Sequence, residues 1–187
     1  MSQHKTDILI VGLGLAGMTA AITAAKNGKK VTIITKTKNI VSGNTPWAQG
    51  GIVYKGLNDS PDKLKKDILK AGAGHCWEEA VDQLCNSGPK LVQDILINTL
   101  KTGFDKQGTN FKRVSEGAHS DARVIYNTDK TGKTIHEAAL KHLQSLPNVE
   151  ILTNHIAIDL LTFSHHSTIS TDIYKKPACF GAMVLNK

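Results

Sequence analysis

Three glycines at fixed spacing are the most specific chemical signal in this 187-residue sequence. Gly12, Gly14 and Gly17 form a GxGxxG pattern that follows an apolar run and opens an alanine-rich stretch. In such a pattern the first glycine allows a tight turn, the second lets the backbone approach a pyrophosphate, and the third permits close helix-to-strand packing. The helix N-terminus that follows attracts the phosphate charge. The context favours a dinucleotide site over a purely structural turn, and the candidate residues are Gly12, Leu13, Gly14, Leu15, Ala16 and Gly17.

The pattern alone does not identify the dinucleotide. An acidic residue about twenty positions further on would hold a ribose hydroxyl, but the second apolar run ends in Thr35 and Lys36. Lys36 can pair with the 2′-phosphate of NADP, or it can contact the adenosine part of a flavin cofactor. The residues leave both readings open at this point.

The apolar runs around the glycines predict a strand, a helix and a second strand, which together form a βαβ unit. Both strands are apolar on successive residues, as expected of parallel strands buried on both faces. We therefore predict an α/β fold with a parallel sheet flanked by helices and a small antiparallel β-meander. The expected parallel strands are 8–11, 31–35 and 149–152, and the expected meander strands are 156–163 and 179–185.

Helices dominate the middle of the chain. Ser60 followed by Pro61 is typical of a helix start, and further helices are expected over 77–86, from Pro89 to Leu100, and around Ile135 to Leu146. The polar stretch 105–131 has no periodicity and is predicted to be a functional loop.

Composition excludes several classes of protein. The formal charge of +7 comes almost entirely from dispersed lysines, with only two arginines, so we expect no nucleic-acid partner. Glycines interrupt the uncharged stretch 8–25, which therefore predicts no membrane span. Three cysteines without CxxC spacing favour the cytoplasm, and His165 and His166 lack the partners of a metal site, so no metal is expected.

A wider match identifies a family. The loop Ser42–Ile52, the segment Ala71–Gly74 and the segment Glu116–Ser120 follow the glycine pattern in order. Together they resemble the FAD-dependent flavoproteins of the succinate dehydrogenase and fumarate reductase family, and within it the aspartate oxidases. The resemblance runs from Asp7 to Lys187 and implies a Rossmann-like FAD-binding domain.

The resemblance assigns cofactor contacts to this sequence. It implies that Gly12–Gly17 hold the FAD pyrophosphate, that Lys36 lies by the adenosine, and that the backbone of Ile156 and Ala157 contacts the adenine. It also implies that one loop wraps the flavin side of FAD. That loop comprises Asn44, Thr45, Pro46, Trp47, Ala48, Gln49, Gly50 and Gly51. Because Asn44 stands where membrane-bound relatives carry a histidine linked to FAD, we expect noncovalent FAD.

Glu116 is the one catalytic candidate. In aspartate oxidases a carboxylate in this motif pairs with the substrate ammonium, which succinate lacks. The implied reaction oxidises L-aspartate to iminoaspartate in de novo NAD biosynthesis, with dioxygen or fumarate as electron acceptor. A soluble fumarate reductase or succinate dehydrogenase remains the alternative, in which Glu116 is an exposed loop carboxylate. Ala118 and Tyr126 depart from the family pattern in this segment, and His119, Ser120 and Arg123 are expected to order it.

The number of predicted strands indicates how much of the fold this sequence contains. Doubly wound sheets usually have five or six strands, and this sequence predicts about three parallel ones. We therefore expect residues 1–187 to be the N-terminal portion of an FAD-binding domain, without the family's capping and C-terminal helical domains and inactive alone. A non-catalytic FAD-binding fragment is the other alternative, and exposed sheet surface would favour self-association.

Overall fold

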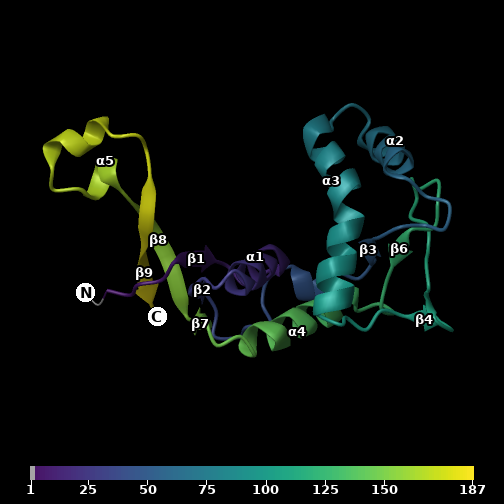
Figure 1. Ribbon diagram of the computed structural model, residues 1–187, viewed down its shortest axis with the longest axis horizontal. Helices are drawn as coiled ribbons and strands as arrows, with labels where there is room; N and C mark the ends of the chain where they lie inside the picture. The colour runs from purple at the N-terminus through teal and green to yellow at the C-terminus, as the bar shows by residue number, and fades with distance from the viewer. Residues whose placement is uncertain (1–2) are drawn as a thin grey trace. The chain divides into compact units, whose positions relative to one another are not determined.

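The computed structural model describes residues 3–187 (Figure 1). The chain divides into two compact units. The first unit combines the chain up to Ser42 with residues 143–187, and the second unit comprises residues 43–142. We describe each unit by itself.

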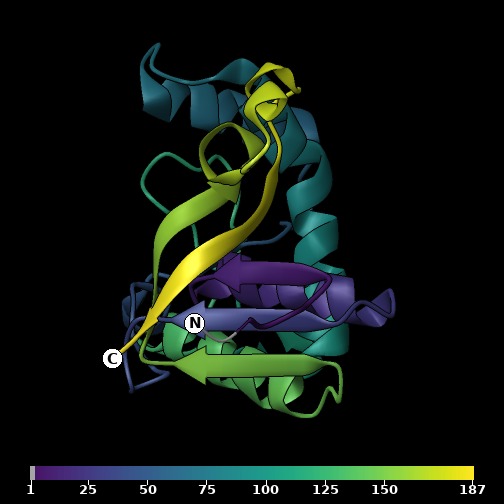
Figure 2. The ribbon, with the colours of Figure 1, turned by 90° about the vertical axis from the view of Figure 1, so that its left-hand side faces the viewer.

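A three-stranded parallel sheet forms the centre of the first unit. It comprises β1 (Ile8–Val11), β2 (Val31–Thr35) and β7 (Val149–Thr153), with β2 between the other two (Figure 2). All five residues of β2 are buried, which explains why this strand is apolar on successive residues. The predicted parallel strands are confirmed, including the pairing of β2 with the distant β7.

Helix α1 (Leu15–Lys26) packs against β1 and β2 through a buried face. Met18, Ala21, Ile22 and Ala25 recur at helical spacing and form that face. The helix ends at Asn27, and Gly28 follows with a φ of +74°. The Asn148 side chain, just before β7, donates to the Ala25 and Lys29 carbonyls at 2.9 and 2.8 Å. This amide therefore ties the end of α1 to the start of the third strand.

A long antiparallel pair completes the first unit. It consists of β8 (His155–Thr162) and β9 (Cys179–Asn186), which run side by side in Figure 2. A short helix α5 (Phe163–His166) and a 3-10 turn η3 (Ser170–Tyr174) connect them. The predicted small antiparallel meander is thus a two-stranded hairpin. Its faces carry exposed apolar side chains, including Ile158, Leu160 and Phe180.

Two helices, α2 (Pro61–Gly72) and α3 (Glu78–Leu91), form the core of the second unit. Ser60 caps α2, because its hydroxyl accepts a hydrogen bond from the Lys63 N–H at 3.2 Å. Leu64, Val81 and Cys85 form the apolar cluster between the helices. The cluster fixes α2, and α2 in turn carries side chains of the site described below.

The expected helix break before Pro89 was wrong. Helix α3 runs through Pro89 to Leu91 and continues directly into η2 (Val92–Thr99), which has π-helical hydrogen bonding. Proline lacks the N–H that an α-helix needs in its interior, and the wider π turn follows it. Val81, Cys85, Val92 and Leu96 are all buried. Their continuous apolar stripe explains why packing kept the segment helical.

The polar stretch 105–131 contains short strands rather than an unstructured loop. These strands are β4 (Lys106–Gln107), β5 (Asn110–Phe111) and β6 (Val124–Ile125), and β6 pairs with β3 (Ile52–Val53). Strands of two residues are too short to leave a periodic pattern. Helix α4 (Thr131–Gln144) follows and ends before Pro147. Over residues 3–187, no helix has both the length and the apolar character needed to cross a membrane.

Candidate functional site

The glycine-rich turn joins β1 to α1 in the first unit. Gly12 has a φ of +105°, a conformation that residues with a side chain rarely adopt. Its N–H donates to the Ile34 carbonyl of β2 at 2.9 Å. Gly14 is the N-cap residue of α1, with no side chain to cap the helix and no acidic residue in the first turn. The turn therefore presents a helix N-terminus to an anion.

Gly17 sets the distance between α1 and β1. A Cβ atom at this position would lie well under 3.0 Å from the Gly12 carbonyl oxygen and 3.2 Å from the Ile10 Cγ2 atom. Only glycine permits this approach, as the spacing of the pattern predicts. Leu13 is 4% exposed. Its side chain therefore belongs to the core, and it contributes only its backbone to the surface of the turn.

Lys36 follows the last residue of β2 and is exposed. Because β1 and β2 are parallel, the glycine-rich turn and Lys36 lie at the same carboxyl edge of the sheet. Ile156 and Ala157 lie in β8, opposite Leu185 and Val184 of β9. Both are partly buried, and a bulge follows Ala157.

The loop Asn44–Gly51 belongs to the second unit and contains a 3-10 turn, η1 (Thr45–Trp47). The Trp47 N–H donates to the Asn44 carbonyl, and Pro46 is buried while Trp47 is 78% exposed. Gly51 has a φ of +120°, and a Cβ there would lie 2.6 Å from the Val124 Cγ1 atom. Buried proline and tight glycine packing therefore hold a loop in which Asn44 and residues 47–50 are exposed.

Glu116 lies beside this loop. Its Oε1 atom is 3.7 Å from the position that a Cβ would take at Gly50. The Glu116 carbonyl accepts a hydrogen bond from the His119 N–H at 2.9 Å, which closes a backbone turn over residues 116–119. The structure thus brings the catalytic candidate of the sequence against the loop assigned to the flavin.

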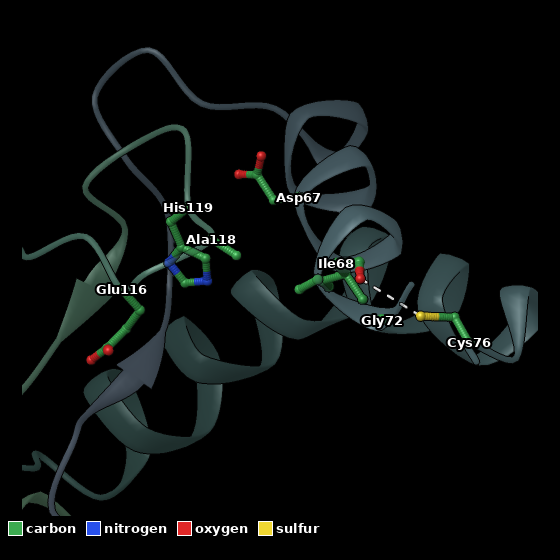
Figure 3. Close-up of a pocket in the computed structure, with 8 residues that line it drawn as sticks. Asp67, Ile68, Gly72, Cys76, Glu116, Ala118 and His119 are labelled. Carbon is green, nitrogen blue, oxygen red and sulfur yellow. Dashed lines mark hydrogen bonds between the residues drawn. The ribbon is translucent and has the colours of Figure 1, made fainter. Parts of the chain in front are cut away.

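A cavity of about 420 Å³ lies between the Glu116 turn and helix α2 (Figure 3). Figure 3 shows the Glu116 carboxylate pointing away from the α2 side chains, while the Cys76 thiol contacts the Ile68 carbonyl. The residues that line the cavity are Asp67, Ile68, Ala71, Gly72, Cys76, Glu116, Ala118 and His119. No group of three His, Cys, Asp or Glu side chains within residues 3–187 is placed to hold a metal ion.

An ionic network that includes the cavity residue Asp67 orders the segment after Glu116. Arg123 is fully buried, and its guanidinium donates to Asp59 at 2.7 and 2.9 Å and to Asp67 at 2.5 Å. Asp67 also accepts from the Ser120 N–H and hydroxyl at 2.8 and 2.9 Å. The expectation that Ser120 and Arg123 order this segment is confirmed. Their carboxylate partners were missed, because a single Asp in a helix or loop gives no signal of a distant arginine.

The network shifts the pKa values of its members. The Ser120 N–H, followed by the Arg123 guanidinium, lowers the pKa of Asp67 to about 2. The hydrogen bonds that Arg123 donates to Asp59 lower the pKa of Asp59, and the same bonds, accepted by Asp59, raise the pKa of Arg123. All three groups are thus charged at neutral pH, and charge-assisted hydrogen bonds to a fully buried guanidinium hold the segment.

The family description "FAD binding domain" matches residues 7–186. The chain belongs to this FAD-binding family. It is 41% identical over 158 residues to the L-aspartate oxidase of Halobacterium salinarum, covering 84% of this chain and 30% of that protein. It is 30% identical over 197 residues to the L-aspartate oxidase of Pseudomonas aeruginosa, covering 100% of this chain and 35% of that protein.

The fold of this FAD-binding chain matches solved structures. E. coli quinol fumarate reductase superimposes with a TM-score of 0.84 at 21% identity, over 100% of this chain and 30% of that one. A flavocytochrome c3 fumarate reductase superimposes with a TM-score of 0.75 at 19% identity. This likeness shows the fold, an α/β FAD-binding architecture. The chain therefore spans about a third of the length of the curated relatives named above.

The residues present fit FAD, the cofactor of the family. The Gly12–Gly17 turn has an uncapped helix N-terminus and the close strand approach at Gly17 that a pyrophosphate site requires. The acidic ribose partner of many NAD sites is absent, since β2 ends at Thr35 and Lys36 follows it. Lys36 alone suits both FAD and NADP, and the family match favours FAD.

Proposed function

We propose that this chain holds FAD in an L-aspartate oxidase, an enzyme that oxidises L-aspartate to iminoaspartate in de novo NAD biosynthesis. The observation that carries the proposal is the position of the Glu116 carboxylate, 3.7 Å from the Cβ position of Gly50. A carboxylate beside the loop assigned to the flavin suits an ammonium-bearing substrate. The chemistry that FAD supplies when bound is two-electron oxidation, with dioxygen or fumarate as final acceptor.

Two sets of residues are proposed to hold FAD. In the first unit, the Gly12–Gly17 turn binds the pyrophosphate, Lys36 lies by the adenosine, and the backbone of Ile156 and Ala157 contacts the adenine. In the second unit, the backbone of Asn44–Gly51 wraps the flavin. The glycine φ values and close approaches described above support this assignment.

Glu116 is proposed to orient the substrate. An ionised carboxylate accepts a short, charge-assisted hydrogen bond from the α-ammonium of L-aspartate. Succinate has no ammonium and would leave this carboxylate unpaired, so Glu116 discriminates between the two dicarboxylates. The hydrogen bond from the His119 N–H and the buried Arg123 network hold the backbone segment that carries Glu116.

The first experiment measures FAD retention. The purified chain is mixed with FAD, desalted and examined by visible absorbance near the flavin bands. Retained colour that acid precipitation releases into the supernatant supports noncovalent binding, as expected for Asn44 in place of a histidine. A colourless protein after desalting would contradict FAD binding by this chain, and colour that stays with the precipitate would contradict noncovalent attachment.

The second experiment tests the substrate assignment on the FAD-loaded full-length protein that contains this chain, because residues 1–187 are expected to be inactive alone. L-Aspartate is expected to perturb the flavin spectrum, and Glu116→Gln to weaken that response about 10-fold or more, because a charged hydrogen bond is lost. Glu79→Gln, at an exposed position in the first turn of α3, is the matched control. An equal response to succinate that Glu116→Gln leaves unchanged would instead favour a fumarate reductase or succinate dehydrogenase.

A further inference from the structure

The first turn of α4 packs directly on the loop assigned to the flavin. The Gly132 N–H donates to the Ala48 carbonyl at 2.8 Å. A Cβ at Gly132 would lie 2.8 Å from the Ala48 carbonyl oxygen, 2.9 Å from the Ala48 Cβ and closer still to the Thr45 carbonyl oxygen. Real Cβ atoms essentially never come within 3.0 Å of such neighbours. Two of the three obstructing atoms are backbone oxygens, which cannot move by a change of rotamer.

Glycine is required at this position because there is no space for a side chain, and not because of the backbone conformation. Gly132 lies within α4 and is absent from the glycines with positive φ among the described residues. Glycine inside a helix destabilises it relative to alanine, because the unfolded chain is more flexible. The close contact with Thr45 and Ala48 accounts for a glycine where alanine would otherwise be better.

Hydrogen bonds fix the helix end that bears Gly132. The Asn127 N–H donates to the Thr131 Oγ1 atom at 2.9 Å, and the Thr134 hydroxyl donates to the Asn127 Oδ1 atom at 3.1 Å. Thr131 is only 2% exposed. The loop thus rests on a helix end that these hydrogen bonds hold in place.

We infer that Gly132 is a positioning residue for the cofactor loop. Its missing side chain lets the carbonyls of Thr45 and Ala48 dock on α4, and this docking sets the course of Asn44–Gly51 toward FAD. The inference rests on the proposed FAD-binding role of that loop. It adds to FAD binding a required residue that lies outside both the glycine-rich turn and the loop itself.

Gly132→Ala tests the inference, with Gly88→Ala as the matched control. Gly88 is also helical, and a Cβ there would meet only the Leu84 Cγ atom at 3.9 Å. Two readouts are taken on the 187-residue chain: amide hydrogen exchange of peptides covering 44–51 without FAD, and FAD affinity by titration. We expect Gly132→Ala to speed exchange over 44–51 and weaken FAD binding at least 10-fold. Gly88→Ala should keep both within twofold of the unmodified chain.

The two readouts separate this inference from the proposed function. If the unmodified chain binds no FAD, the proposed function fails, and exchange over 44–51 still decides the role of Gly132. If Gly132→Ala folds and both exchange and FAD affinity match the control, the inference is overturned. If Gly132→Ala does not fold, Thr131→Val replaces it, because this isosteric change removes the acceptor for the Asn127 N–H. Faster exchange over 44–51 in that variant supports the inference, and unchanged exchange contradicts it.

Discussion

Arg123 and Asp59 form a two-point ion pair with both side chains withdrawn from water. The Arg123 Nε and Nη2 atoms lie 2.7 and 2.9 Å from the two Asp59 carboxylate oxygens, and the guanidinium is 0% exposed. The remaining Nη1 atom reaches Asp67. This single side chain therefore joins the loop before α2, α2 itself and the segment between the Glu116 turn and β6.

Replacing Arg123 is expected to destabilise the second unit severely. Arg123→Met would leave two buried carboxylates without their cation, and breaking such a pair from one side costs about 3–5 kcal/mol. That is a large part of the stability of an ordinary domain. The free energy of unfolding from urea titration is the measurement.

Arg113→Met, which alters the only other arginine of the sequence, is the control for this prediction. Arg113 donates to the carbonyls of Lys55 and Phe111 rather than to a carboxylate, so its loss should cost clearly less. Equal losses of unfolding free energy in the two variants would show that the ion pairs around Arg123 stabilise the fold no more than the hydrogen bonds of Arg113 do.

Acid is expected to weaken the same network. The pKa of Asp67 is about 2 in the folded chain, below the value of about 3.9 in an unfolded one. Its stabilisation is thus fully present above about pH 4 and is lost as the pH falls toward 2. Asp59 shifts in the same direction. Urea midpoints measured from pH 5 to pH 2.5 should fall, and more steeply in the unmodified chain than in Asp67→Asn. Asp129→Asn, at an exposed position, should leave the slope unchanged, and parallel slopes for all three proteins would contradict the prediction.

The sequence predicts the first unit better than the second. Parallel strands β1, β2 and β7 are each a short apolar run, and α1 shows a helical apolar spacing, so local pattern and tertiary burial agree. In the second unit, Pro89 signals a helix start that packing overrides. Strands β4 and β6 have only two residues each, too few for alternation to appear.

The residues of the candidate site also differ in how well the sequence predicts them. The glycine-rich turn can be predicted from the sequence because its glycines lie close together along the chain, and their close contacts follow from their lack of a side chain. The Arg123 network cannot be predicted in this way, since Asp59 and Asp67 lie 64 and 56 positions away along the chain. Gly132 was also missed, because its obstructing neighbours Thr45 and Ala48 meet it only in three dimensions.

Ser60 is expected to stabilise α2 through its cap. Its hydroxyl accepts the Lys63 N–H, one of the N–H groups that the first helical turn leaves without a partner. Ser60→Ala should lower the free energy of unfolding by about 1 kcal/mol. Ser87→Ala, at an exposed position inside α3, should be neutral or slightly stabilising. Thermal unfolding of the three proteins measures the difference, and an equal effect at both serines would count against a capping role.

Gly17 links the packing of the first unit to cofactor binding. Gly17→Ala would place a Cβ against the Gly12 carbonyl and the Ile10 side chain, which forces α1 away from β1 and moves the pyrophosphate turn. Overpacking of this kind costs about 1–3 kcal/mol, and FAD affinity should fall at least 10-fold. Gly103→Ala adds a methyl whose nearest neighbour is the Thr134 Cγ2 atom at 4.0 Å, so it should change neither quantity. FAD titration of both variants is decisive: a folded Gly17→Ala protein that binds FAD as tightly as Gly103→Ala would separate the helix-to-strand approach from cofactor binding.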